Sequence, residues 1–559
     1  MRGTNSNHPL RLYILITILI VVLSGLVIRI FYLGVFNRSF LVSQSVARSV
    51  REVEIPAHRG IIKDRNGSPL AISIPLSSIW INPKILNISN AEQLQLAELL
   101  NVPLSYIHNK TSQTKKGFVY LKRMVNPDIA AKIKVMDIHG VFFQDEYQRF
   151  YPEAESTVHI LGFTDVDDHG QEGLELAYDK WLRGTPGKKR VLKDRLGNTI
   201  ADLGIVKESE PGHDLVLSID RRIQYLTYRE LANTVQKYHA ETGMAVVLSV
   251  KTGEILAMVN QPSCNPNMRH DLNPACYRNR AVTDLFEPGS TAKAFSVASA
   301  LESGKYNPGT WIDTNPGYMK VNGHSIYDDE HVNHGVLTVA QVLQKSSDIG
   351  VAKMTLSLAP NRLLGVLQRV GFGQTTDSGF PGEVIGHLPD NLRSRPIVLA
   401  TLAFGYSMST NVLQLAKSYA AIAALGIMRQ VTFLKVDKPI SEKRVFTTKI
   451  ASEILAMLET VVEVGGTGTK AQVTGYRVAG KTGTAYIAAK HGYYKDRYFA
   501  IFSGIAPIEN PELVVAVVIR NPRGGLYHGG SVAAPAFSNI MQGALRVMNV
   551  RPDDLEKSN

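Results

Sequence analysis

The segment 287–293 places a serine and a lysine at a spacing that suits acyl transfer. Pro288 and Gly289 predict a turn, and residues 290–302 predict a helix with apolar positions on one face. Ser290 would then begin the helix, and Lys293 would follow on the same face. A serine hydroxyl becomes a useful nucleophile when a base takes its proton. Burial and the positive end of the helix would both lower the pKa of the lysine toward that role.

The competing interpretation is a capping serine beside a solvated lysine, which the S-x-x-K pattern alone favours because it often arises by chance. Two later patterns change that balance. They are Ser346-Ser347-Asp348, with an aspartate where asparagine is usual, and Lys481-Thr482-Gly483-Thr484. An earlier K-T-G copy at 251–253 lies between two apolar runs, so it predicts the turn of a hairpin instead.

The three ordered patterns resemble those of serine β-lactamases and penicillin-binding proteins. Residues 59–67 resemble the N-terminal signature of the class B penicillin-binding proteins, and residues 529–537 resemble their C-terminal one. The match covers nearly all of residues 10–550 and is strongest with the division-specific peptidoglycan D,D-transpeptidases. The resemblance implies an enzyme that cross-links stem peptides at the division septum and that β-lactams inhibit covalently.

The resemblance also implies a role for each motif residue. Ser290 would attack the carbonyl of a terminal D-Ala-D-Ala, with Lys293 as its base. Ser346 would relay a proton to the leaving amine, next to Asp348. The substrate carboxylate would bind at Lys481, Thr482, Gly483 and Thr484. Backbone N–H groups of Ser290 and Thr484 would form the oxyanion hole.

The implied partners are peptidoglycan stem peptides, β-lactams, a membrane-embedded glycosyltransferase and other division proteins, and the family needs no cofactor or metal. The net charge of +12 over 559 residues would suit an anionic partner. However, no nucleic-acid motif accompanies the charge, so we interpret it as a mildly basic solvated surface and expect no nucleic-acid partner.

Residues 12–28 contain no charged side chain, and the apolar run continues to residue 36 apart from Arg29. The run predicts a transmembrane anchor at 12–36. Basic residues in the short tail 1–11 place that tail in the cytoplasm and the rest of the chain outside the bacterial inner membrane. A cleaved signal peptide is the alternative, although the apolar run is long for one and no clear cleavage site follows it.

The remaining chain predicts an α+β protein with two domains. Residues 37–213 would form the non-catalytic pedestal that the resemblance implies. Residues 214–550 would form the transpeptidase domain, followed by a tail at 551–559. In the latter domain, strands at both ends with helices between them predict one antiparallel sheet flanked by helices. The resemblance identifies this arrangement as the serine β-lactamase-like fold.

Three other features allow more than one interpretation. A metal site could form from His324, Asp328, Asp329, His331 and His334, although these residues lie in a predicted loop. The glycine-rich segment 465–469 lacks the lysine and serine pattern of a phosphate-binding loop, and the resemblance makes it a mobile loop beside the active site. Cys264 and Cys276 are the only cysteines, and their spacing leaves a disulfide open.

Four other functions remain as alternatives at this point. A β-lactamase would hydrolyse the acyl-enzyme, but no deacylating glutamate is evident. A D,D-carboxypeptidase would use water in place of an amine. An elongation-type transpeptidase would share the motifs. A scaffold that only binds would not need intact motifs.

Overall fold

The computed structural model describes residues 9–193, 199–268, 274–390, 392 and 395–554. Most of the predicted cytoplasmic tail (1–8), the end of the predicted C-terminal tail (555–559) and residues 269–273 between the cysteines lie outside these ranges. The chain forms two compact units. The first comprises Met1–His58, Pro75–Tyr147 and Gly184–Pro211, and the second comprises Arg59–Ile74, Gln148–Arg183 and Gly212–Asn559. The domain limits at 37, 213 and 550 stay predictions.

The N-terminal region is helical. Helix α1 (Pro9–Phe31) continues through a π-helical turn (Tyr32–Phe36), and α2 (Arg38–Ser49) follows. The span Pro9–Phe36 is 28 residues long and apolar, with no side chain buried against the protein. By length and composition it can cross a membrane, although a signal sequence would share these properties.

The first unit combines a small sheet with a helical layer. Its sheet has the order β1-β6-β7, formed by Val50–Ile55, Gly187–Lys193 and Thr199–Lys207. A second group packs three helices near β4 (Val119–Val125); they are α3 (Asn90–Leu99), α4 (Leu104–Thr111) and α5 (Pro127–Val135). The long strands β3 (Pro69–Ile81) and β5 (Val141–Phe150) each contribute residues to both units.

The second unit is built on a five-stranded antiparallel sheet in the order β10-β9-β19-β18-β17. The strands are β9 (Thr242–Ser249), β10 (Ile255–Gln261), β17 (Ala479–Ala488), β18 (Tyr493–Ala506) and β19 (Leu513–Arg520). The sheet joins the two ends of the unit, because β19 pairs with β9 from Leu513 opposite Ser249 to Arg520 opposite Thr242. The predicted antiparallel sheet flanked by helices is confirmed.

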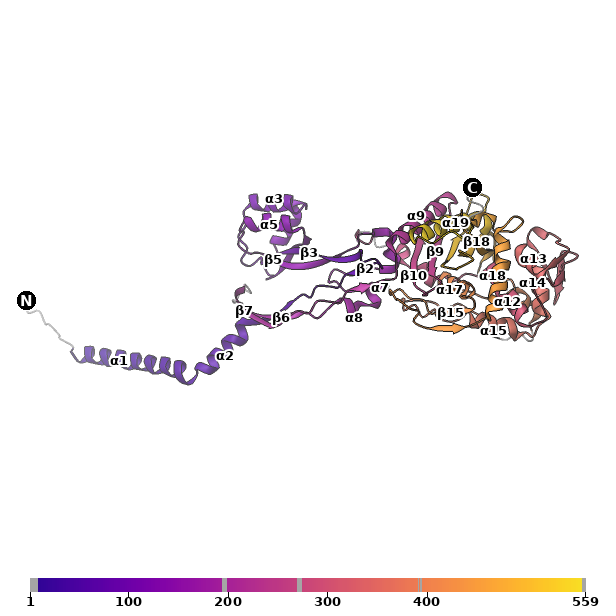
Figure 1. Ribbon diagram of the computed structural model, residues 1–559. Helices are drawn as coiled ribbons and strands as arrows, with labels where there is room; N and C mark the ends of the chain where they lie inside the picture. Colours follow the sequence, from indigo (N-terminus) through magenta and orange to yellow (C-terminus); the bar gives the residue numbers. More distant parts are fainter. Residues whose placement is uncertain (1–8, 194–198, 269–273, 391, 393–394, 555–559) are drawn as a thin grey trace, which may run out of the picture. The chain divides into compact units, whose positions relative to one another are not determined.

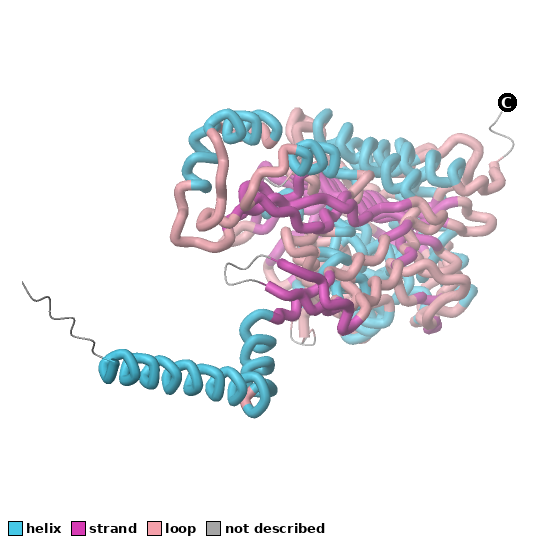
Figure 2. The backbone as a smooth tube through the Cα atoms, turned by 90° about the vertical axis from the view of Figure 1, so that its left-hand side faces the viewer, coloured by secondary structure: helices cyan, strands magenta, loops and turns pink. Residues whose placement is uncertain are grey.

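Alternate residues of β9 enter two separate cores, as the period of a strand requires. Val246 and Leu248 belong to the core beneath α12 (Lys293–Glu302), α17 (Val412–Ala423) and α18 (Thr448–Val462). Ala245 and Val247 belong to the core beneath α9 (Arg221–Lys237) and α19 (Gly529–Val547). Figure 1 shows these two helical layers on opposite sides of the strands, and Figure 2 shows the same backbone turned by 90°, with helices in cyan and strands in magenta.

The structure differs from the predicted elements mainly at their ends. The sequence pattern of residues 336–344 predicts a helix, but this segment begins as strand β14 (Val336–Thr338), because the capping box of Thr338 with Gln341 starts α13 (Val339–Gln344) three residues later. Residues 215–219 have the pattern of a strand, of which only β8 (Leu215–Val216) forms. Residues 172–182 predict one helix, and the structure has two short helices there, α7 (Gly173–Ala177) and α8 (Asp179–Leu182).

The remaining elements are short. They are β2 (Ile62–Lys63), η2 (Ala154–Ser156), α6 (Val158–Leu161), α10 (Pro274–Tyr277), α11 (Arg280–Thr283), η3 (Gly289–Ala292), β11 (Trp311–Asp313), β12 (Tyr318–Val321), β13 (His324–Tyr327), η4 (Asp329–His331), α14 (Asp348–Leu356), α15 (Asn361–Arg369), α16 (Pro396–Leu402), β15 (Ile427–Arg429), β16 (Glu442–Arg444) and η5 (Thr469–Ala471).

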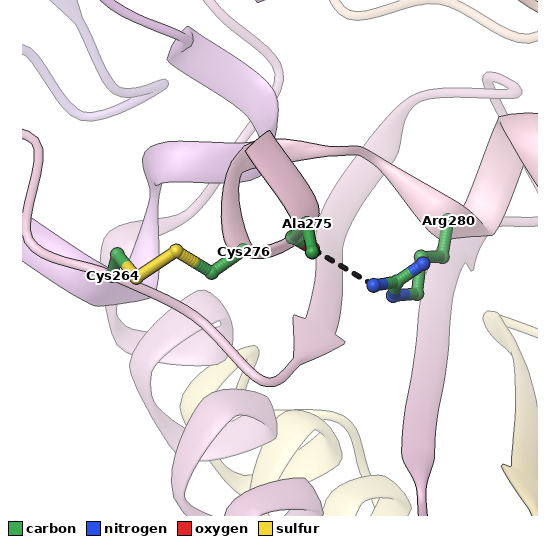
Figure 3. The surroundings of a disulfide bond; sticks show 4 residues. All are labelled: Cys264, Ala275, Cys276 and Arg280. Carbon is green, nitrogen blue, oxygen red and sulfur yellow. Dashed lines mark hydrogen bonds between the residues drawn. A yellow bond between two sulfur atoms is a disulfide. The ribbon is translucent and has the colours of Figure 1, made fainter. Parts of the chain in front are cut away.

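A disulfide joins Cys264 to Cys276, with Cα atoms 5.6 Å apart. The spacing of the two cysteines left open whether they form a disulfide, and the structure shows that they do. Figure 3 shows the bond and the guanidinium of Arg280, which donates to the carbonyl of Ala275 at 2.8 Å. The Asn267 side chain exchanges two hydrogen bonds with the backbone of Tyr151, at 2.9 and 3.0 Å. The cysteine loop is therefore fixed to the second unit at several points.

Candidate active site

Ser290 lies in a 3-10 turn, η3, that leads directly into α12. The predicted α-helix from residue 290 is therefore wrong for its first turn. Gly289 begins that turn with φ of 53°, and its N–H donates to the carbonyl of Gly405 at 3.2 Å. A side chain at Gly405 would place its first carbon 2.1 Å from the carbonyl oxygen of Gly289. The nucleophile candidate thus lies on a turn that requires two glycines in close contact.

Hydrogen bonds from α17 and within the turn itself stabilise the serine turn. The hydroxyl of Tyr419, buried in α17, donates to the carbonyl of Thr291 at 2.8 Å. The Thr291 hydroxyl donates to the carbonyl of Pro288 at 2.7 Å. Ser290 itself stays half-buried at the surface of the turn. Its hydroxyl is therefore presented on a rigid support while remaining accessible.

The Lys293 side chain is fully buried one turn after Ser290. Its Nζ donates to the carbonyl of Ser346 at 2.5 Å and to the Ser346 hydroxyl at 3.1 Å. The same Nζ lies 2.5 Å from Oδ1 of Asp348. The second motif therefore surrounds the amine of the first motif.

Ser346 connects the two lysines. It lies between α13 and α14 with φ of 61°, a left-handed conformation that serine adopts rarely. Its hydroxyl accepts from Lys293 at 3.1 Å and from Lys481 at 2.9 Å. Because both lone pairs of the oxygen are engaged, its own hydrogen can be donated to a third group.

Lys481 lies on β17 and is fully buried. Burial, and next the charge of Lys293, hold the pKa of Lys481 well below 10.5, while Asp348 opposes the shift. For Asp348, burial raises the pKa, and the ammonium of Lys293 opposes that shift. About a quarter of the Asp348 side chain is nevertheless exposed. The charges of Lys293, Lys481 and Asp348 therefore act on one another within the site.

The third motif brings β17 against the serine turn. A side chain at Gly483 would place its first carbon 2.9 Å from the Pro288 carbonyl oxygen, so only glycine allows this approach. A carbon added at Gly289 would lie 3.1 Å from the carbonyl oxygen of Thr484. The Thr484 hydroxyl accepts from the N–H of Gly529, the first residue of α19, at 3.2 Å. These contacts place the start of the serine turn directly beside Thr484 of β17.

Two other sequence features also find their places. The K-T-G copy at 251–253 forms the turn between β9 and β10, and its Lys251 pairs with Glu512 at 2.5 Å. The glycine-rich loop reaches the third motif, since the hydroxyl of Thr467 lies 2.8 Å from that of Thr482. The first is structural, and the second borders the candidate site.

The histidine and aspartate segment does not gather around one point. Across the described ranges, no group of three or more His, Cys, Asp or Glu side chains is placed to hold a metal ion. Instead, Asp328 is hydrogen-bonded to the second motif, and Asp329 lies 3.6 Å from His528 of the α19 cap.

Gly405, Tyr419 and Asp328 support the site, yet the sequence did not assign them to it. Gly405 and Tyr419 belong to no motif, and their partners lie far away in the chain. Asp328 was noticeable in the sequence as one of several His and Asp residues in a polar loop, but that pattern predicted a metal site instead of a support for the second motif.

Family models match both units of the molecule. The Penicillin binding protein transpeptidase domain matches residues 243–542, and the Penicillin-binding Protein dimerisation domain matches residues 54–217. The chain belongs to the penicillin-binding protein transpeptidase family. All eight motif residues of this penicillin-binding protein lie inside the first match.

Named relatives match along almost the whole chain. The chain is 42% identical to the peptidoglycan D,D-transpeptidase FtsI of Escherichia coli (strain K12) over 543 residues, which cover 96% of this chain and 92% of the relative. It is 40% identical to the probable peptidoglycan D,D-transpeptidase PbpC of Pseudomonas aeruginosa, covering 95% and 94%.

Solved structures resemble this penicillin-binding protein as well. The transpeptidase domain of Burkholderia pseudomallei penicillin-binding protein 3 is 41% identical with a TM-score of 0.56, covering 60% of this chain and 97% of that one. A peptidoglycan synthetase from Bifidobacterium adolescentis is 25% identical with a TM-score of 0.71, covering 90% and 98%.

Proposed function

We propose that this chain is a division-type peptidoglycan D,D-transpeptidase that works through an acyl-enzyme on Ser290. One observation carries the assignment of roles: the Ser346 hydroxyl accepts hydrogen bonds from the amines of Lys293 and Lys481, and Lys293 lies one turn after Ser290. The family membership and the names of the long relatives support the reaction class. β-Lactams acylate the same serine, because they present a reactive carbonyl to it.

In the first step, the hydroxyl of Ser290 attacks the carbonyl carbon of the penultimate D-alanine, and Lys293 takes its proton. The carbonyl oxygen becomes an oxyanion, which the N–H groups of Ser290 and Thr484 stabilise. When this intermediate collapses, the peptide bond breaks. Ser346 passes a proton from the lysines to the nitrogen of the departing D-alanine, and an ester remains on Ser290.

In the second step, the amine of a neighbouring stem peptide attacks the ester carbon. Its excess proton returns through Ser346 to the lysine pair, the bond to the serine oxygen breaks, and Ser290 recovers its hydrogen. A new peptide bond thus replaces the one that was broken. A D,D-carboxypeptidase or a β-lactamase would give the acyl group to water at this point.

Lys481, Thr482 and Thr484 bind the carboxylate of the donor peptide. The Lys481 amine lies within 3.3 Å of the Thr482 hydroxyl, so an ammonium and a hydroxyl point to one place. A carboxylate that binds there gains charge-assisted hydrogen bonds. Gly483 contributes its small size, which lets β17 approach the serine.

The apolar helix and the cysteines support a proposed location for this chain. Residues 1–11 lie in the cytoplasm, 12–36 cross the inner membrane, and the pedestal (37–213) and transpeptidase domain (214–550) lie in the periplasm at the division site. The apolar helix and the Cys264–Cys276 bond support this topology, because disulfides persist in oxidising compartments. A membrane-embedded glycosyltransferase and other division proteins are the expected partners.

Labelling by a fluorescent penicillin tests the catalytic assignment. Ser290→Ala should abolish the label while the protein remains folded. Lys481→Ala should slow labelling by about 100-fold or more, the scale expected when an electrostatic contact to the reacting group is lost. The matched variant Lys251→Ala, in the other K-T-G copy, should label at the wild-type rate. Stoichiometric labelling of Ser290→Ala would refute the assignment.

Two further measurements separate the competing functions. Intact mass after penicillin treatment should show a long-lived adduct, whereas rapid return to the free mass with hydrolysed drug would favour a β-lactamase. Depletion in cells should give filaments, and round cells would instead identify an elongation-type enzyme.

A further inference from the structure

Asp328 is a buried carboxylate behind the second motif. It lies between β13 and η4 and is only 3% exposed. The hydroxyl of Ser347 donates to its two oxygens, at 2.8 and 3.1 Å, and the N–H of Ile349 donates to Oδ1 at 3.0 Å. No step of the proposed reaction uses this group.

Asp328 binds Ser347 and Ile349, and these two residues alternate along the chain with Ser346 and Asp348, which contact the lysines. Ser347 follows Ser346, and Ile349 follows Asp348. Ser347 also caps α14, since its oxygen accepts the N–H of Gly350 at 3.0 Å. The Asp328 carboxylate therefore holds the backbone directly after Ser346, whose hydroxyl faces the two lysines.

This fixation matters because Ser346 has φ of 61°. A non-glycine residue persists in that conformation only when its surroundings hold it there. In the relaxed conformation the hydroxyl would turn away from at least one of the two lysine amines, which now lie 3.1 and 2.9 Å from it.

We propose that Asp328 is a positioning residue for the transfer reaction, which holds Ser346 in the conformation that bridges Lys293 and Lys481. The proposal rests on the function proposed above. Asp328 touches neither substrate nor reacting atoms and acts through Ser347 and Ile349.

Several charged groups face this carboxylate. His334 Nε2 lies 4.0 Å from Oδ2, and Asp329 is its neighbour in the chain. On the motif side, the charge of Asp328 is a minor contribution to the raised pKa of Asp348, after burial. Loss of the Asp328 charge would therefore lower the pKa of Asp348 only slightly.

Acylation kinetics test the proposal directly. Asp328→Asn keeps the size of the side chain but cannot accept both hydrogen bonds at full strength. We expect its second-order rate constant with a fluorescent penicillin to fall by 10- to 100-fold, the scale of a small misplacement of a catalytic group. The matched control Glu330→Gln removes a charge from the same turn and should keep the wild-type rate. A folded Asp328→Asn protein with wild-type kinetics would overturn the proposal.

A double-mutant cycle separates positioning from general structural support. If Asp328 acts through the Ser346 hydroxyl, Asp328→Asn should slow acylation less than two-fold in a Ser346→Ala background. Fully additive losses would show that Asp328 acts elsewhere and would overturn the proposal.

Ser347→Ala provides a second variant should Asp328→Asn fail to fold. It breaks the same link from the other end and should show the same non-additivity with Ser346→Ala. The wild-type rate is measured first. If the wild type is not acylated at all, the proposed function fails; if it is acylated and both cycles are additive, only the positioning role fails.

Discussion

Asp348 differs from the asparagine usual at its position, and its charge has a measurable consequence. Its Oδ1 lies 2.5 Å from the Lys293 amine. When Lys293 acts as the base, the largely buried carboxylate loses the ammonium that opposes the rise in its pKa, and this loss disfavours the reactive form. An amide at this position has no such effect.

We therefore predict that Asp348→Asn moves the alkaline rise of the acylation rate to lower pH. The measurement is the second-order rate constant with penicillin as a function of pH in both proteins. Identical midpoints would show that the carboxylate does not couple to the base.

Lys481 gives a second prediction at this scale. Because its pKa is held well below 10.5, Lys481 loses its proton at a lower pH than an exposed lysine does. A ligand carboxylate favours the ammonium and raises this pKa, so binding takes up a proton at pH values between the pKa of the free protein and that of the complex. Affinity for carboxylate ligands should accordingly fall as the pH rises.

Calorimetry in buffers of different ionisation enthalpy measures this uptake. A non-reacting Ser290→Ala protein should take up nearly one proton per bound penicillin at alkaline pH. Ser290→Ala combined with Lys481→Met should take up none, and an equal uptake in both proteins would contradict the prediction.

The motif residues could be predicted because each belongs to a short local pattern. The spacing of Ser290 and Lys293 places them on one face of a predicted helix, and Lys481 begins a segment with the pattern of a strand. Their supports could not be predicted, because Tyr419, Gly405 and Asp328 reach the site only through tertiary contacts. The left-handed φ of Ser346 also leaves no trace in the sequence, since its neighbours impose it.

At the scale of elements, the contact between Gly289 and Gly405 controls the serine turn. Gly405→Ala adds a carbon 2.1 Å from the Gly289 carbonyl oxygen, at φ of 84°. Gly304→Ala is a matched control, because φ is 72° and nothing lies within 4 Å of the added carbon. Both variants should lose about 1–2 kcal/mol of folding free energy from the left-handed conformation.

Only Gly405→Ala should also displace the turn and slow acylation by about 100-fold. Thermal unfolding and penicillin kinetics on both variants check this expectation. Equal kinetics would mean that the turn tolerates the displacement.

Most elements of the second unit could be predicted from apolar periodicity, and the misplaced ends have local causes. The strand β14 was missed because Val336–Thr338 continues an apolar pattern into α13, and only the Thr338 capping box separates them. The 3-10 form of η3 arises from contacts with β17 and Gly405, which the local sequence does not contain.

At the scale of the whole molecule, the disulfide should contribute about 3 kcal/mol to stability by restricting the unfolded chain. The double variant Cys264→Ser, Cys276→Ser should lose this amount in denaturant unfolding and keep its acylation rate, because neither cysteine belongs to the three motifs. Unfolded, unreduced wild-type protein should show no thiol that reacts with maleimide. Two reactive thiols would rule out the bond.

The N-terminal helix leads to a prediction about processing. An uncleaved anchor should leave residues 9–36 in protein purified from membranes. N-terminal sequencing decides the matter, and a mature start after residue 20 would identify a signal peptide instead.

The close glycine contacts also limit how this protein can evolve under antibiotic selection. A carbon added at Gly405 or Gly529 would lie 2.1 or 2.2 Å from a backbone oxygen, so a change there would disable the enzyme along with drug binding. Resistance must preserve the reaction with the natural peptide. Substitutions that reject a drug should therefore accumulate at exposed side chains near the site, such as Tyr486 and Tyr493, whereas the glycines should stay invariant in resistant isolates.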